Sequence, residues 1–373
     1  MHSRFILMNI ATILLPNFNN ELVLPFTFDC LRKNVDCTKV HLLMVDDGSE
    51  DASVAVAKQE IPRCGFASSE IIERKHEGIV PTLNSALSMA KTDFVVRIDG
   101  DATVETPGWI SILLETLRFD EVGIVGGQVM WESGRVHSFG RSVFTDWGLH
   151  DMGCCPLEPV GNRTFDSIVY RPLQGFRPGL PYEVDTILGV CTAFRREEAL
   201  AVGGFDMRFN PVWIEDDDFG LSIRNLGKRI VVHPSVQVVH RPSLKGSRKP
   251  GETTMKQPKL PNSAFRTIRK NLSRRVSRSI RALWGEVSPP PTIEDFIPAE
   301  NESWRRSLLL THYANWKAKW GFDPVNPNMN EIMQRYWDTS FCRNHNPSQL
   351  RKSLEFLGSL GTGTVPMPPD GLL

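Results

Sequence analysis

Hydrophobic and polar positions alternate in a regular order over the first hundred residues. Short apolar runs, typical of buried strands, are followed by segments in which apolar residues recur every three or four positions, as on one face of a helix. This pattern predicts strands at residues 10–15, 41–45, 70–73 and 94–98, and helices at residues 21–32, 53–59 and 80–90. Strands that alternate with helices favour a mostly parallel sheet with helices on both faces.

The pattern changes after residue 132. Residues 132–183 are rich in Gly, Pro and aromatic residues and show little periodicity, which predicts a long loop region of the kind that is often functional. Further on, the pattern predicts regular structure at 184–194, helices at 196–202 and 217–226, and short strands at 230–232 and 236–239 around Pro234.

The last third of the chain differs in composition. A stretch rich in Lys, Pro, Gly and Ser, residues 245–261, predicts a mobile linker. A helical segment with Trp residues follows it. We therefore predict three parts: an α/β domain over residues 1–243, a basic flexible linker over 244–261, and a helical C-terminal extension over 262–373.

Polar clusters follow three of the predicted strands. They lie at residues 16–19, 46–49 and 99–101. Ligands of parallel α/β sheets bind in the crevice beyond the carboxyl ends of the strands. One such cluster alone is more often the cap of the next helix. Three clusters at successive strand ends favour a ligand site.

Composition narrows the class of protein. The 373 residues are 41% hydrophobic and 23% charged, the balance of an ordinary globular protein. No apolar run is long enough for a membrane-spanning helix. The first residues resemble a short signal peptide, but no small-residue cleavage site follows them.

The seven cysteines show neither zinc-type pairs nor a regular disulfide spacing. We expect a cytoplasmic protein.

The net charge of zero is a cancellation between two regions. Residues 241–281 hold 13 Lys or Arg and one acid, so the rest of the chain carries the opposite excess. Within that basic segment, apolar residues from Phe265 to Leu283 fall on one helical stripe. A solvated helix packed on the first domain explains this pattern. A basic helix over residues 262–284 can also lie on an anionic membrane, and we expect no nucleic-acid partner.

Acidic clusters supply the candidate chemistry. Asp99 and Asp101 flank a glycine and can place oxygens near one hard divalent cation, which in turn can bridge a diphosphate. The carboxylates of Asp46 and Asp47 could accept hydrogen bonds from a nucleoside base or a ribose, or could merely cap a helix. His240 closes an apolar strand, and a neutral imidazole suits Mn²⁺.

A fourth cluster, Glu215-Asp216-Asp217-Asp218, has apolar residues on both sides, Trp213 and Ile214 before it and Phe219 and Leu221 after it. Part of it should therefore face an apolar wall. Burial raises the pKa of a carboxyl group toward the value of a useful general base.

These motifs, taken in order, resemble glycosyltransferase family 2 over residues 10–241. The matching segments are Pro16-Asn17-Phe18-Asn19, Val45-Asp46-Asp47-Gly48-Ser49-Glu50-Asp51, Asp99-Gly100-Asp101, Gly203-Gly204-Phe205-Asp206, Glu215-Asp216-Asp217-Asp218-Phe219-Gly220-Leu221 and Val239-His240. The resemblance implies a GT-A fold and an inverting enzyme that uses a nucleotide-diphosphate sugar. Residues 131–140 and 188–196 are similar to rhamnosyltransferase-like bacterial members.

The resemblance also implies a role for each matching residue. Asp216 is expected to be the general base. Asp99, Asp101 and His240 are expected to hold Mn²⁺ or Mg²⁺, with Asp101 the more direct ligand and Asp99 nearer the ribose. The expected nucleotide-binding residues are Pro16, Asn19, Asp46, Asp47 and Asp99, and the expected acceptor-side residues are Gly189, Trp213 and Glu215.

The implied partners are a nucleotide-diphosphate sugar donor and a glycan or lipid-linked acceptor, in the synthesis of an envelope or surface glycan. The Gln-x-x-Arg-Trp motif of processive synthases is absent, which argues against a polysaccharide synthase. The alternative from another class is a non-catalytic GT-A-fold scaffold tethered at membranes. A dehydrogenase is excluded because Gly-x-Gly-x-x-Gly does not follow the first strand.

Overall fold

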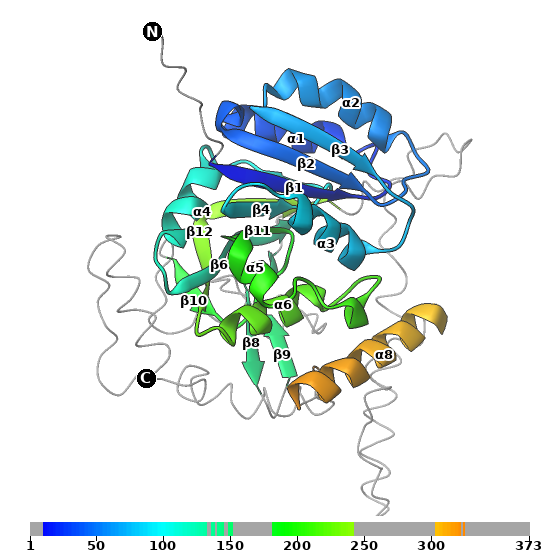
Figure 1. The fold of residues 1–373 in the computed structure, drawn as a ribbon, viewed down its shortest axis with the longest axis vertical. Coiled ribbons are helices and arrows are strands. Elements are labelled where there is room, and N and C mark those ends of the chain that lie inside the picture. Colours follow the sequence, from blue (N-terminus) through cyan, green and yellow to red (C-terminus); the bar gives the residue numbers. More distant parts are fainter. Residues whose placement is uncertain are drawn as a thin grey trace, which may run out of the picture. The chain divides into compact units, whose positions relative to one another are not determined.

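The computed structural model describes residues 10–132, 136–138, 140–144, 148–151, 181–241, 303–321 and 324. Its first half has the predicted alternation of strands and helices, with bounds that differ by a few residues (Figure 1). In chain order these are β1 (Ala11–Asn17), α1 (Leu24–Asn34), β2 (Val40–Asp46), α2 (Ser53–Cys64), β3 (Ser68–Glu73), α3 (Ile79–Met89) and β4 (Phe94–Ile98).

These four strands are parallel to one another and lie in the order β3-β2-β1-β4. Strand β1 pairs with β2 from Ala11 opposite Val40 to Asn17 opposite Asp46. Helix α3 packs on β1 and β2, and α1 packs against α2. Because the strands run in the same direction, their carboxyl ends lie at one edge of the sheet. The expected mixed, mostly parallel GT-A sheet is confirmed.

The second half completes the sheet. Its elements are β5 (Ala102–Val104), α4 (Trp109–Leu117), β6 (Val122–Trp131), β11 (Cys191–Arg195), α5 (Arg196–Ala201), α6 (Glu215–Arg224) and β12 (Arg229–His240). The full strand order is β10-β12-β6-β11-β4-β1-β2-β3, and β11 is antiparallel to both β4 and β6. The sequence pattern did not predict α4 or β6.

Two predictions for this half were wrong. The expected loop region contains four short strands, β7 (Val136–Ser138), β8 (Arg141–Phe144), β9 (Gly148–Asp151) and β10 (Tyr182–Val184). Strands of three or four residues are too short to show a hydrophobic period. The two strands expected around Pro234 are one strand, β12, whose pairing with β6 shifts register between His233 and Gln237. That irregularity accommodates a proline, which cannot donate to the ladder.

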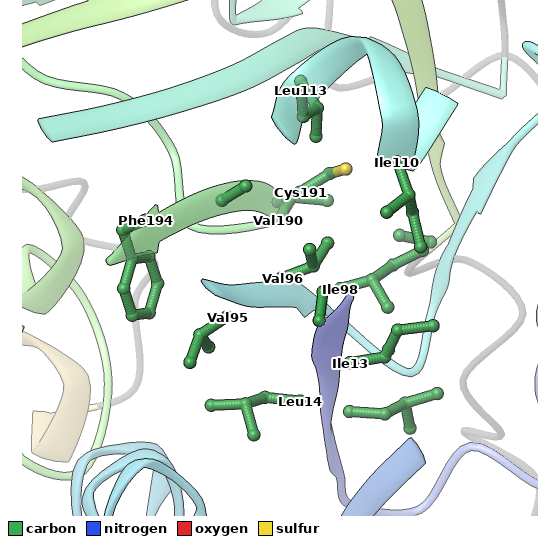
Figure 2. Packing of buried hydrophobic residues seen from close by; sticks show 14 of the residues in the cluster. Ile13, Leu14, Val95, Val96, Ile98, Ile110, Leu113, Val190, Cys191 and Phe194 are labelled. Carbon is green, nitrogen blue, oxygen red and sulfur yellow. The ribbon is translucent and has the colours of Figure 1, made fainter. Parts of the chain in front are cut away.

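The core lies on both sides of the central strands. Every residue of β1 and of β2 is buried, as expected for parallel strands covered on both faces. Figure 2 shows Ile110 and Leu113 of α4 on the side of β4 toward which Val96 points, while Val95 points away. None of the helices in the described ranges is long and apolar enough to cross a membrane.

The cysteines in this part of the chain behave as buried apolar residues. Cys37, Cys64 and Cys191 are buried. Burial raises the pKa of the Cys37 thiol to about 12 and that of Cys64 to about 11, so neither is a reactive thiolate. Cys154 and Cys155 lie outside the described residues.

One helix of the predicted C-terminal extension is described, α8 (Ser303–Trp320). The predicted boundaries at 243/244 and 261/262, and the basic helix over 262–284, lie outside the described residues and stay predictions.

Candidate active site

The three polar clusters that follow strands lie side by side at the carboxyl edge of the sheet. The backbone N–H of Asp47 donates to the carbonyl oxygen of Asn17 at 2.8 Å, and the N–H of Gly100 donates to that of Pro16 at 3.2 Å. The side-chain amide of Asn17 donates to Asp46 Oδ1 at 2.6 Å. The clusters at 16–19, 46–49 and 99–101 therefore form one continuous surface, as the sequence predicted.

Asp46 organises the loop after β2. Its carboxylate accepts hydrogen bonds from the backbone N–H of Ser49 at 2.8 Å and from the Ser49 hydroxyl at 2.6 Å, besides the one from Asn17. Asn19 joins the same loop, because its side-chain oxygen accepts from the backbone N–H of Glu50 at 2.9 Å. Asp46 and Asn19 thus fix the shape of the loop after β2. That they contact a nucleotide stays a prediction.

Asp47 holds the next loop, which follows β3. Its carboxylate accepts hydrogen bonds from the backbone N–H groups of Glu77 and Gly78, both at 2.9 Å, and lies 2.8 Å from His76 Nδ1. The His76 ring stacks on Phe18, with ring centroids 4.2 Å apart. The sequence analysis did not predict His76. Its half-exposed imidazole lies beside the polar clusters that are predicted to bind the nucleotide.

Asp99 meets a buried arginine. Arg97 of β4 is 4% exposed, and its Nε donates to Asp99 Oδ1 at 3.0 Å. The two residues share a face because side chains two apart in an extended chain point the same way. Arg97 Nη2 also lies 3.8 Å from Glu215 Oε1. One guanidinium therefore connects the predicted donor-side carboxylate to the first turn of α6.

Asp101 and His240 come together through the pairing of β5 with β12. The residue after Asp101, Ala102, lies opposite His240 in that ladder, and His240 Nε2 is 3.4 Å from Asp101 Oδ2. His240 Nδ1 lies 3.2 Å from His137 Nδ1, and the rings of Trp131, His137 and His240 are nearly parallel and stack pairwise. His137 was not predicted, and it holds the plane of the His240 ring.

A carboxylate oxygen beside an imidazole nitrogen suits Mn²⁺ or Mg²⁺. The tautomer in which His240 donates from Nδ1 to His137 leaves Nε2 able to bind a metal. Within the part of the chain that the structure describes, no three His, Cys, Asp or Glu side chains are grouped to hold a metal ion by themselves. The structure thus places two of the three predicted metal ligands, Asp101 and His240, next to each other. The third, Asp99, pairs with Arg97 instead.

The four acids of residues 215–218 form the first turn of α6. The amino end of a helix favours negative charge, and each carboxyl group has a different partner. Asp217 pairs with Arg141 and accepts from the Thr186 hydroxyl at 2.6 Å. Asp218 pairs with Lys319 of α8 at 2.8 Å. The expectation that part of this cluster is buried is met, since Glu215, Asp217 and Asp218 are buried.

Glu215 and Asp216 differ in their surroundings. Burial, together with the charge of Asp216, raises the pKa of Glu215 to about 8 although Arg97 opposes the shift. Glu215 therefore keeps its proton at neutral pH, which removes one negative charge from beside Asp216. Asp216 is half-buried, and its Oδ2 accepts from the backbone N–H of Gly189 at 2.9 Å.

Gly189 lies between Arg97 and Asp216 and contacts both. A Cβ at this position would lie 2.1 Å from Arg97 Nη1, so only glycine leaves room for the guanidinium. The next residue, Val190, accepts a hydrogen bond from the backbone N–H of Asp99 at 3.0 Å. Asp99 and Asp216 are therefore anchored on two consecutive residues.

A strained bend leads into α6. Trp213 and Ile214 both have left-handed backbone conformations, with φ of 79° and 56°. Such conformations cost about 1–3 kcal/mol each for residues other than glycine and persist only where the surroundings enforce them. The bend fixes the direction in which Glu215 and Asp216 leave the loop. Trp213, predicted on the acceptor side, lies directly before them.

The sequence reasoning missed the cations of this site. Arg97 could have been found, because a charged residue inside an otherwise apolar strand is a signal of a buried ion pair. Arg141 and Lys319 could not, because they lie 76 and 101 residues from the acids that they meet.

Comparisons with known proteins identify a family. The model of glycosyl transferase family 2 matches residues 12–197, about half of the chain, and ends before α6. The O-antigen biosynthesis protein RfbC of Myxococcus xanthus is 27% identical over 165 residues, 44% of this chain and 12% of the relative. The uncharacterized protein y4gI of Sinorhizobium fredii is 22% identical over 239 residues, 63% of this chain and 24% of the relative. The chain spans a quarter or less of either relative.

Among solved structures, the mannosyltransferase PcManGT of Pyrobaculum calidifontis, in complex with GDP-Man and Mn²⁺, superposes with a TM-score of 0.46 at 17% identity, over 96% of this chain and 87% of that one. GalNAc-T7 with UDP, GalNAc and Mn²⁺ gives a TM-score of 0.48 at 15% identity, over 62% and 44%.

Proposed function

The chain belongs to glycosyl transferase family 2, and from that premise we propose that it is a glycosyltransferase that transfers a sugar from a nucleotide-diphosphate sugar to a hydroxyl acceptor with inversion of the anomeric centre. One observation carries this proposal. The donor-side Asp99 and the base Asp216 are held by consecutive residues, through Val190 and Gly189 respectively. A proton acceptor is thereby fixed beside the edge where the three strand-end clusters meet.

In the proposed reaction, the acceptor oxygen attacks the anomeric carbon from the face opposite the diphosphate. Asp216 takes the proton of the attacking hydroxyl as the new C–O bond forms. The bond between the anomeric carbon and the diphosphate oxygen breaks, and its electron pair leaves with the nucleoside diphosphate. A single displacement of this kind inverts the configuration. Neutral Glu215 limits the negative charge beside the base.

Asp101 and His240 are the residues that would hold a divalent cation, completed by oxygens of the donor. A bound Mn²⁺ or Mg²⁺ would supply Lewis-acid neutralisation of the diphosphate leaving group. The PcManGT and GalNAc-T7 structures each contain Mn²⁺. Because these structures are only 15% and 17% identical to this chain, the proposed metal site rests on Asp101 and His240 themselves.

We expect donor binding and transfer to depend on the metal. With Mn²⁺, one of a set of UDP-, GDP- and dTDP-sugars should raise the melting temperature, since a ligand that binds the folded state stabilises it. The same donor, ¹³C-labelled, should give an inverted glycoside with a hydroxyl acceptor, and EDTA should abolish both effects until Mn²⁺ is restored. Melting curves and NMR of the product measure these outcomes.

Asp101→Asn tests the ligand assignment in the same assays. This variant should lose the metal-dependent part of the melting shift, because an amide oxygen is a much weaker ligand for a hard cation. Asp36→Asn, at an exposed ion pair with Lys39, is the matched control and should keep the shift. Full transfer after exhaustive chelation would refute the metal proposal. Donor binding without any transfer would instead support the scaffold alternative.

The proposal extends to an envelope or surface glycan as the product, and to a glycan or lipid-linked acceptor. The Myxococcus relative is named for O-antigen biosynthesis. A cytoplasmic enzyme that meets a lipid-linked acceptor would work at the inner face of the membrane. The basic residues of 262–284 give the sequence-based reason to propose contact with anionic lipid.

Liposome flotation tests the membrane contact. The protein should float with vesicles that contain anionic phosphatidylglycerol and stay at the bottom with neutral phosphatidylcholine vesicles. Raising the salt concentration should release it, because exposed charges are screened over about 10 Å or less at 0.1 M salt and above. Binding that is equal for both vesicles, or absent for both, would refute this part of the proposal.

A further inference from the structure

Helix α8 lies on the segment that carries the strained bend. The residues of α8 that meet this segment, His312, Trp316, Lys319 and Trp320, recur at the spacing of one helical face. Trp316 is fully buried, and its ring lies 6.3 Å from that of Phe209. His312 packs edge-on against the same phenylalanine. The helix is therefore part of the same core as the site, although it is far away in the sequence.

Upstream of the bend, α8 holds the backbone. The side-chain amide of Asn315 donates to the carbonyl oxygen of Arg208 at 2.9 Å, and His312 Nε2 lies 3.1 Å from the carbonyl oxygen of Asn210. Both contacts fall within five residues of Trp213, the first of the two left-handed residues of the bend.

Downstream of the bend, α8 holds Asp218. The Lys319 ammonium donates to Asp218 Oδ2 at 2.8 Å, and Trp320 Nε1 donates to Asp218 Oδ1 at 2.9 Å. The same ammonium donates to Asp206 Oδ2 at 2.9 Å. One cation therefore joins carboxylates on the two sides of the bend. Asp206 also pairs with Arg208 at 2.6 Å, whereas Lys319 is the cation that pairs with Asp218.

We propose that α8 positions the general base: Lys319, by joining Asp206 to Asp218 across the bend at Trp213 and Ile214, holds the first turn of α6 so that Asp216 meets the acceptor hydroxyl. This inference rests on the proposed function for the role of Asp216. It gives the unassigned C-terminal extension a place in the catalytic unit. Lys319 is a positioning residue, because it acts through Asp218 and the helix turn rather than on the substrate.

The test removes the cation and keeps the length of the side chain. Lys319→Met should lower kcat by about 10- to 100-fold, since small misplacements of a catalytic group cost on this order. The KM for the donor should change by less than about twofold, because donor binding does not use this turn. Lys319→Arg should recover most of kcat. Lys317→Met, on an exposed position of the same helix turn, is the matched control and should behave as wild type.

Hydrogen exchange gives a readout that does not depend on activity. Backbone amides of residues 213–218 should exchange about tenfold faster in Lys319→Met than in Lys317→Met, while amides of β1 and β2 stay protected. If Lys319→Met does not fold, Trp320→Phe removes one hydrogen bond to Asp218 and should give the same local effect at a smaller size.

The outcomes separate the two proposals. Unchanged exchange at 213–218, or exchange that rises equally throughout the protein, would overturn the positioning role. Wild-type transfer with an unchanged kcat in Lys319→Met would also overturn it and would leave the proposed function intact. A wild-type protein that transfers no sugar would refute the proposed function, and local exchange would then still decide whether α8 holds the bend.

Discussion

Replacing Asp216 by asparagine should lower kcat by about 10²- to 10⁴-fold, the range that a positioned general base contributes. Asparagine has nearly the same shape, and its amide oxygen can still accept the hydrogen bond from the backbone N–H of Gly189. What it lacks is an oxygen that can take the proton of the acceptor hydroxyl. Donor affinity should stay nearly unchanged. Steady-state transfer rates, with donor binding measured separately, check both parts.

The neighbouring carboxyl provides a stringent control. Burial raises the pKa of Glu215 to about 8, so at neutral pH its side chain is a neutral acid, which glutamine imitates. Glu215→Gln should therefore lose less than about tenfold in kcat, well below the loss on removal of a base. A larger loss in Glu215→Gln than in Asp216→Asn would assign the base to Glu215 and contradict the proposed mechanism.

Replacing Arg97 by methionine should lower the free energy of unfolding by about 1–3 kcal/mol, the cost of leaving a polar group without its hydrogen-bond partner, here the partly buried carboxylate of Asp99. The guanidinium is buried between Asp99, at 3.0 Å, and Glu215, at 3.8 Å. Methionine fills much of the same volume, so the loss comes mainly from the charge and the hydrogen bonds rather than from a cavity. Urea denaturation of the intact chain measures the change.

Two further variants show whether the guanidinium itself is needed. Arg97→Lys keeps the charge but cannot reproduce the planar arrangement of donors, and should show an intermediate loss. Arg118→Met removes an exposed arginine and should change stability by less than about 0.5 kcal/mol, as is usual at the surface. Equal stability of the Arg97→Met and Arg118→Met proteins would show that the pair with Asp99 contributes nothing.

The sequence predicted the strands that carry the site because their signal is local. A run such as the one that ends at Asp46 and Asp47 is apolar along its whole length and stops at polar residues, so its place in a parallel sheet could be inferred without coordinates. The meeting of three strand ends followed from that topology. The short strands β7 to β10 were missed, because three or four residues show no hydrophobic period. Helix α4 and strand β6 were also missed, although they are nine and ten residues long.

The sequence by itself therefore determined the alternation of strands and helices in the first half, the sheet edge at which the polar clusters lie and the acids placed there, since each depends on a pattern within a few residues. Only the tertiary structure decided how those acids are used. It brought His137 to His240, Arg141 to Asp217, and Lys319 to Asp218, 101 residues away. Such pairs depend on where distant segments pack, and packing is set by the whole core rather than by any local pattern.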